Sequence, residues 1–365
     1  MEFQYVRNVN FNHRYISPQQ LHHYLESHYA QQIKLLGTST LGLPIYSLRI
    51  GTGKTKVAAW SQMHGNESTA TLALLDLLYS WNSNQVIMDA LFSEIQLDFI
   101  VMLNPDGSKV WTRRNSLDID INRDFIKESS KEIKILKQFV ASNHYDYALN
   151  LHDQRTIFTT DGEHPATLSF LSPSENVARS LTEHRKQSMA VIASIYKALK
   201  SKLPHRIGRY SDEFYPLSVG DNFMKMGLPT VLFEGGHYEN DYYRNHTRQY
   251  YTEALYIALK AMADLKGDTT NFEMYSEIPE NKDTHCDIIY NNLNINTGEE
   301  PYLVDVAVQY REEFTEGHEE LTFQPYILDI GDARRKKAWK TIDCEGKLFQ
   351  DKRPQLDQKA QFTIG

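Results

Sequence analysis

The stretch Val57-Ala58-Ala59-Trp60-Ser61, which runs into His64-Gly65-Asn66-Glu67, decides the fold class of this chain. Val57–Ser61 is a short apolar run of the kind that forms a buried strand. Glu67–Trp81 follows with leucines at helical spacing, so it predicts a helix. A buried strand that leads through a short polar turn into a helix is typical of α/β proteins.

The same alternation continues to about residue 267. Further strands are predicted at residues 95–103, 147–151 and 230–233, and further helices at residues 18–30, 128–143, 175–203 and 250–265. We therefore predict an α/β fold with a mostly parallel mixed sheet flanked by helices.

The pattern of apolar and polar residues changes after Gly267. Gly267–Asn271 is a polar stretch typical of a linker, and residues 302–310 and 321–330 alternate in the manner of half-buried antiparallel strands. We predict a catalytic domain over residues 1–267 and a small β-rich domain over 272–365. The charged run Arg311–Glu320 is interpreted as a solvated face.

Composition limits the function classes. The chain has 365 residues, of which 41% are hydrophobic, and its net charge of −8 is unlike that of a nucleic-acid or anionic-membrane binder. No apolar stretch approaches the roughly 18 residues that a transmembrane helix needs. The start of the sequence lacks a signal-peptide pattern. Only Cys286 and Cys344 occur, which excludes a disulfide scaffold or a cysteine-ligated metal. We expect a soluble cytoplasmic protein; the oligomeric state is left open.

Polar clusters follow four predicted strands, at His64–Glu67, Asn104–Gly107, His152–Gln154 and Glu234–His237. Ligands bind outside the carboxyl ends of the strands in open α/β sheets, so these clusters indicate an active site. His64, Glu67 and His152 have the ligand types of a catalytic zinc site, and Glu234 would be a free carboxylate suited to general-base work. From the residues alone, His64 could equally be a satisfied structural histidine.

A set of short motifs occurs in one order along residues 40–265. The motifs are His64-Gly65-Asn66-Glu67-Ser68-Thr69, Asn104-Pro105-Asp106-Gly107, Arg113-Arg114-Asn115, Asp120-Ile121-Asn122-Arg123-Asp124-Phe125, Leu151-His152 and Gly227-Leu228-Pro229-Thr230-Val231-Leu232-Phe233-Glu234. The set resembles the zinc carboxypeptidases of the carboxypeptidase A-like (funnelin) family.

The resemblance implies a role for each matching residue. His64, Glu67 and His152 would hold one zinc ion, and Glu234 would be the general base that activates the zinc-bound water. Arg113 would stabilise the oxyanion, and Asn122 with Arg123 would hold the terminal carboxylate of the substrate. Otherwise, Arg123 would be a surface ion-pair former.

Two features of the family have less definite counterparts. The tyrosine that covers the substrate is assigned first to Tyr215 and second to Tyr210, although either could be a packing aromatic. Asp221 falls near the specificity pocket, where an acid would favour a basic terminal residue; it could also be a helix-capping aspartate. Asp118 stands where the family often has glycine.

The predicted function is a zinc metallocarboxypeptidase that removes the C-terminal residue of a peptide or peptide-like substrate with a free carboxylate. The alternatives are a zinc-dependent N-acyl amino acid deacylase, similar to aspartoacylase and succinylglutamate desuccinylase, and a cell-wall peptide amidase. A binding module that kept the fold and lost catalysis would need a replaced ligand or a replaced Glu234, and none is replaced.

Overall fold

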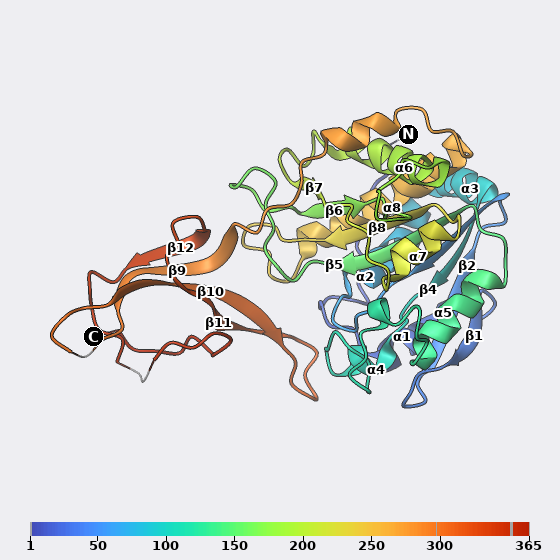
Figure 1. Ribbon diagram of the computed structural model, residues 1–365. Helices are drawn as coiled ribbons and strands as arrows, with labels where there is room; N and C mark the ends of the chain where they lie inside the picture. The colour runs from blue at the N-terminus through green and yellow to red at the C-terminus, as the bar shows by residue number, and fades with distance from the viewer. Residues whose placement is uncertain (1, 297, 351–352, 365) are drawn as a thin grey trace.

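The computed structural model describes residues 2–296, 298–350 and 353–364, and it contains two separate β-sheets (Figure 1). The larger sheet has eight strands in the order β1-β2-β4-β3-β5-β8-β6-β7. Its strands are β1 (Ile33–Thr38), β2 (Pro44–Ile50), β3 (Thr55–Trp60), β4 (Ile95–Ile100), β5 (Tyr147–Asp153), β6 (Leu168–Leu171), β7 (Ile207–Arg209) and β8 (Thr230–Gly235).

The centre of this sheet is parallel. Strand β3 pairs in parallel with β4 and β5, and β5 pairs in parallel with β8, whereas β2 and β6 join the sheet antiparallel to β4 and β8. The carboxyl ends of β3, β5 and β8 therefore lie at one edge. The predicted α/β fold with a mixed sheet is confirmed.

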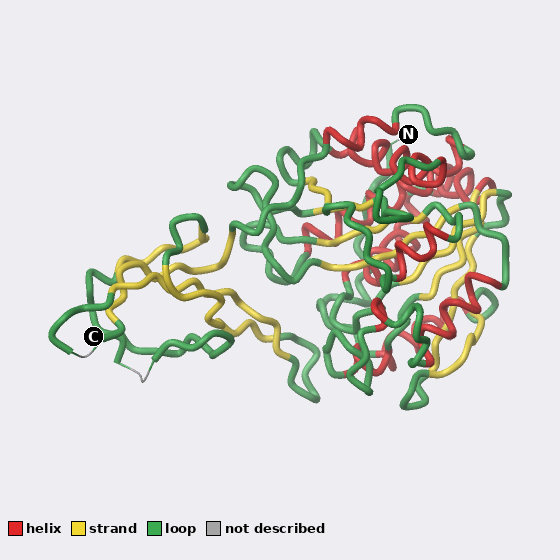
Figure 2. The backbone as a smooth tube through the Cα atoms, viewed as in Figure 1, coloured by secondary structure: helices red, strands yellow, loops and turns green. Residues whose placement is uncertain are grey.

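Helices cover both faces of the sheet (Figures 1 and 2). They are α1 (Pro18–Tyr29), α2 (Thr69–Tyr79), α3 (Gln85–Glu94), α4 (Pro105–Lys109), α5 (Lys131–Ala141), α6 (Glu183–Leu199), α7 (Val219–Lys225) and α8 (Asn245–Leu265). Successive residues of β3 point to opposite faces of the sheet. Val57 and Ala59 pack in one core with α2, α6 and α8. Ala58 and Trp60 pack in a second core with α5 and α7.

The smaller sheet has the order β11-β10-β9-β12 and lies to one side of the larger one (Figure 1). Its strands are β9 (His285–Asn294), β10 (Leu303–Glu313), β11 (Thr322–Gly331) and β12 (Lys337–Asp343). Ile288, Val306, Val308 and Ile327 form part of its own core. The turn Phe272–Glu277 packs Tyr275 into the larger core, so the second sheet itself begins at His285.

Several predicted elements differ from the structure. Residues 175–182 are not helical; α6 begins only after Thr182, whose side chain accepts a hydrogen bond from the backbone of Arg185 and caps the helix. The sequence reading missed β1, β2, β9 and β12, among others. Among the described residues, no helix is long and apolar enough to cross a membrane.

Candidate metal centre and active site

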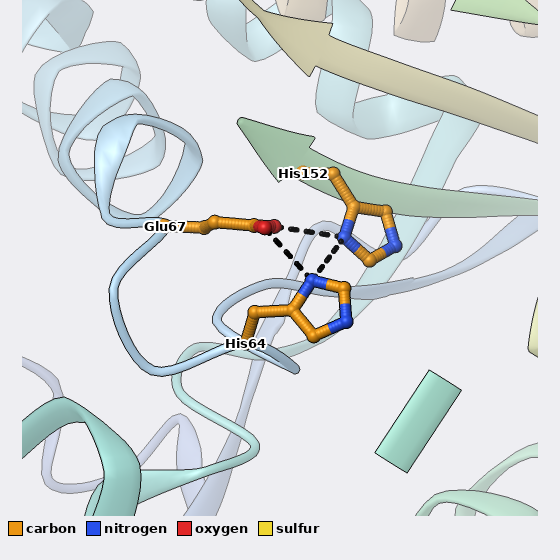
Figure 3. Close-up of side chains that lie close together, drawn as sticks. All are labelled: His64, Glu67 and His152. Atoms are coloured by element: carbon orange, nitrogen blue, oxygen red, sulfur yellow. Dashed lines mark hydrogen bonds and ion pairs between the residues drawn. The ribbon is translucent and has the colours of Figure 1, made fainter. Parts of the chain in front are cut away.

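The three predicted metal ligands lie together in a buried cluster at the carboxyl edge of the larger sheet (Figure 3). His64 Nδ1 is 2.8 Å from Glu67 Oε1, and His152 Nδ1 is 2.9 Å from Glu67 Oε2. The two Nδ1 atoms are 3.2 Å apart, and the potential ligand atoms all lie within 4.8 Å of one another. His64 and Glu67 come from the turn between β3 and α2, and His152 comes from β5.

Gly65 allows this turn to lie against the Asn104–Gly107 segment. A Cβ at position 65 would stand 2.1 Å from the backbone carbon of Gly107, which no side chain can tolerate. The Asn104 side chain accepts a hydrogen bond from Gly107 N at 2.9 Å and donates one to Met63 O at 3.4 Å. The Asn-Pro-Asp-Gly segment therefore supports the turn that carries His64.

Asp120 orients the His64 ring. Its Oδ1 lies 3.2 Å from His64 Nε2, and its Oδ2 accepts hydrogen bonds from Arg113 Nε and Nη2 at 3.1 and 3.0 Å. A proton on Nε2 leaves the Nδ1 lone pair for a metal ion, which is the common arrangement at histidine-ligated metals. Although burial raises the pKa of Asp120, His64 and Arg113 hold it well below its usual range. Asp120 belongs to the Asp120–Phe125 motif, but the sequence alone indicates no role for it.

The donor set fits zinc. Two imidazole nitrogens and a carboxylate are ligands that zinc accepts, and all three side chains are buried. Burial raises the pKa of Glu67, but the adjacent His64 and His152 lower it by more, so the carboxylate is ionised. Burial lowers the pKa of His152, which favours the neutral ring that binds a metal.

Glu234 lies beside His152 on the neighbouring strand. The parallel pairing of β5 and β8 aligns His152 with Glu234, so both side chains lie on the same face of the sheet. Burial raises the pKa of Glu234 well above its usual range, and the negative charges of Glu67 and Asp153 raise it further. Burial raises the pKa of Tyr210 well above its usual range, and the negative charges of Glu234 and Glu67 raise it further.

Asn122 and Arg123 lie next to the N-terminus of α7. Asn122 Oδ1 accepts a hydrogen bond from Val219 N at 3.0 Å. The exposed Arg123 donates to the backbone oxygen of Asn122, and its guanidinium lies 5.8 Å from the centre of the Tyr215 ring. Among the described residues, no carboxylate pairs with Arg123 within 4 Å, so the ion-pair interpretation lacks a partner here.

Asp221 is buried in the first turn of α7. Its carboxylate accepts hydrogen bonds from the Ser218 hydroxyl and, at 3.3 Å, from Tyr215 N. Ser218 Oγ in turn accepts from Asp221 N at 3.3 Å. These contacts favour the capping interpretation of Asp221.

The prediction of a solvated Arg311–Glu320 run is wrong for Glu312. Its side chain is 8% exposed and pairs with Arg14 and Arg155 behind the metal ligands. A run of adjacent charges in the sequence does not predict this contact. The contact depends on how the smaller sheet packs against the larger domain.

Comparison with known proteins agrees with this geometry. A family model described as zinc carboxypeptidase matches residues 19–222, more than half of the chain. A search of curated protein sequences gave no significant match. Solved structures are similar at the level of the fold, as the following three examples show.

A metallo-carboxypeptidase from Burkholderia cenocepacia has a TM-score of 0.55 at 17% identity, covering 70% of this chain and 71% of its own. Carboxypeptidase A from Helicoverpa armigera has a TM-score of 0.54 at 17% identity, with coverages of 68% and 74%. A Pseudomonas aeruginosa metallo-carboxypeptidase, solved with (2-guanidinoethylmercapto)succinic acid, has a TM-score of 0.51 at 17% identity, with coverages of 71% and 71%.

The family model, together with a His-Glu-His group that could hold the metal ion, identifies a zinc peptidase, a hydrolase. The chain belongs to the zinc carboxypeptidase family.

Proposed function

We propose that this protein is a metallocarboxypeptidase that removes the C-terminal residue of peptides or peptide-like substrates. The observation that carries the proposal is Arg123, an accessible guanidinium without a carboxylate partner among the described residues. It is three residues from Asp120, which contacts the metal ligand His64. A planar guanidinium binds a carboxylate through two parallel hydrogen bonds, so the terminal carboxylate of a substrate is its natural partner.

His64, Glu67 and His152 would hold the zinc ion. When bound there, zinc supplies a Lewis acid that polarises the scissile carbonyl and lowers the pKa of water at the site. Glu234, on the same face as His152, would accept the proton of the attacking water and pass it to the leaving nitrogen.

The remaining residues would position the substrate and stabilise charge. Arg113 Nη1 lies 3.2 Å from His64 Nδ1, close enough to the ligands to donate to the oxyanion that develops during attack. Asn122 and Arg123 would bind the carboxylate, and Tyr215 would cover it, because its ring already lies against Arg123.

The test compares one peptide as the free acid and as the C-terminal amide. We expect the amide to lose more than tenfold in kcat/KM, since a charge-assisted pair contributes roughly 1.5–3 kcal/mol. Arg123→Ala should lower activity on the acid and shrink the difference between the two substrates. Lys127→Ala removes another exposed cation of the same loop and should leave both rates unchanged.

Equal rates on acid and amide would overturn the carboxypeptidase proposal. A panel of N-acyl amino acids is measured alongside, because preferred cleavage of those substrates would instead indicate the deacylase.

A further inference from the structure

One carboxylate of the smaller sheet, that of Glu312, contacts the larger domain. Glu312, near the end of β10, has a side chain that is only 8% exposed. Its Oε1 lies 2.7 Å from Arg14 Nε, and its Oε2 accepts hydrogen bonds from Arg155 Nη1 and, at 3.1 Å, from Trp111 Nε1. An ion pair with Arg14 and hydrogen bonds from Arg155 and Trp111 therefore join one carboxylate of the smaller sheet to three separate segments of the larger domain.

The Arg14 branch of this cluster leads to the metal ligand Glu67. Arg14, which is 1% exposed, has its Nη2 atom 3.4 Å from Asp153 Oδ2. The backbone N–H of Asp153 donates to Glu67 Oε2 at 3.2 Å. Thr69 fixes the Asp153 carboxylate with a hydrogen bond of 2.7 Å. Arg14 thus acts on Glu67 through a single intervening residue.

The Arg155 branch leads to the same ligand from the other side. Arg155 Nη1 donates to the backbone oxygen of Asn66 at 3.3 Å, and Asn66 directly precedes Glu67. Burial lowers the pKa of Arg155, and the charges of Glu312, Glu67 and Asp153 raise it by more. After Glu312, the carboxylate that acts most strongly on Arg155 is therefore the metal ligand itself.

The balance of charge around this cluster depends on Glu312. Arg14, Arg155 and Arg244 are the cations, and Asp153, Glu234 and Glu312 are the carboxylates near them outside the metal ligands. Burial lowers the pKa of Arg244 to about 9, and the nearby charge of Arg14 contributes to this decrease. Without Glu312, Arg14 and Arg155 would lose their shared carboxylate partner, and the carboxylates left near the three arginines would be Asp153, Glu67 and Glu234.

We propose that Glu312 is a positioning residue of the zinc site: it holds Arg155 and Arg14 so that neither competes with the metal ion for Glu67. The smaller sheet then completes the zinc site of the larger domain. This inference rests on the zinc site of the proposed function and does not depend on which substrate is cleaved. Although burial raises the pKa of Glu312, Arg14 and Arg155 hold it at about 2, so the group is anionic at neutral pH.

The test measures zinc affinity of the full chain by competition with a chromophoric chelator at neutral pH. Glu312→Gln keeps the size of the side chain and removes its charge. We expect zinc to bind at least tenfold more weakly, because Arg155 can then pair with Glu67 and adds uncompensated positive charge beside the ion. Affinity within threefold of the wild type would overturn the proposal.

Two controls separate this effect from the docking of the sheets. Glu313→Gln makes the same change one residue along β10, where the carboxylate pairs with Lys359 and Tyr326 of its own domain. Tyr242→Phe removes a 2.6 Å hydrogen bond between the loop after β8 and Asp287 of β9, a contact of the two domains that involves none of the ligands. Both variants should bind zinc as the wild type does, and a loss equal to that of Glu312→Gln in either one would contradict the proposal.

A double variant provides the rescue. Arg155→Met in the Glu312→Gln background removes the competing cation and restores the net charge, so zinc affinity should return to within threefold of the wild type. A role of Glu312 in docking alone predicts no recovery, and that result would overturn the proposal. If Glu312→Gln does not fold, the zinc affinity of the double variant alone is compared with the wild type, again with a limit of threefold.

The two proposals fail separately. If Glu312→Gln loses zinc affinity and the added Arg155→Met restores it, the role of Glu312 is supported. If the wild type cleaves no peptide, the proposed function is wrong, whatever the zinc measurements give.

Discussion

At the scale of single residues, Glu234, the proposed general base, allows catalysis to be tested separately from metal binding. It lies on the same face as His152 and is not one of the three clustered ligands. Glu234→Gln keeps the volume of the side chain and removes the base. We therefore expect unchanged zinc content and a fall in kcat of about 10²–10⁴-fold, the range of general acid–base catalysis.

Steady-state kinetics and elemental analysis of the same preparation check this expectation. Glu239→Gln is the matched control, because Glu239 follows five residues later and pairs with Arg206. Near-normal turnover of Glu234→Gln would contradict the proposed base, and loss of zinc would mean that Glu234 supports the ligands as well.

The residues of the site differ in how well the sequence could reveal them. His64, Glu67 and His152 could be predicted because they lie in or just after the central strands β3 and β5 and because their motifs resemble those of the zinc carboxypeptidases. Asp120 contacts His64 across 56 positions in the chain, and no spacing rule connects the two. Glu312 lies in a run of charged residues whose pattern predicts an exposed face. It is buried because the smaller sheet packs against the larger domain there.

At the scale of elements, α7 links Asn122, one of the two residues proposed to bind the substrate carboxylate, to the core. Ser218 caps this helix and bonds with Asp221, and Val219, the first residue of the helix, donates to Asn122. Ser218→Ala removes the cap and should destabilise the protein by about 1 kcal/mol. Because the loss of the cap loosens the first turn of α7, which carries the Val219 N–H that binds Asn122, KM for the free-acid peptide should rise while zinc content stays the same.

Thr182→Ala is the control for this change. Thr182 caps α6 in the same way, through a hydrogen bond from Arg185 N at 3.3 Å. Denaturant unfolding should give a similar loss of stability in the two variants, with an increase in KM only for Ser218→Ala. The same increase in both would show that α7 has no special part in binding.

The elements themselves show where sequence patterns fail. Helices α2 and α5 could be predicted from the spacing of their apolar residues, to within three residues at each end. The predicted helix at 175–203 was too long at its start, because residues 175–182 form a loop that Arg185 stabilises through the backbone oxygens of Arg179 and Ser180. Strands β9 and β12 lack the continuous apolar run of the central strands: Asn291 and Asn292 interrupt β9, and Lys337 and Lys340 lie in β12.

At the scale of the whole molecule, the contact between the two sheets makes stability depend on pH. The pKa of Glu312 is about 2 in the folded protein, because Arg14 and Arg155 outweigh the effect of burial, against an ordinary value of 4.5. A carboxyl whose pKa is lowered by folding stabilises the protein above its unfolded pKa. That contribution is complete above about pH 5 and is lost as the pH falls through 4.5 towards 2.

The comparison of wild type with Glu312→Gln isolates this contribution. Glutamine does not titrate, so the difference between the two free energies of unfolding should be constant above about pH 5. It should shrink below that pH, by up to about 3 kcal/mol for a shift of this size. Urea unfolding is measured between pH 7 and 2.5 with a chelator present, so that release of zinc from protonated histidines does not contribute. A difference that stays constant down to pH 2.5 would show that Arg14 and Arg155 do not hold Glu312 in its ionised form.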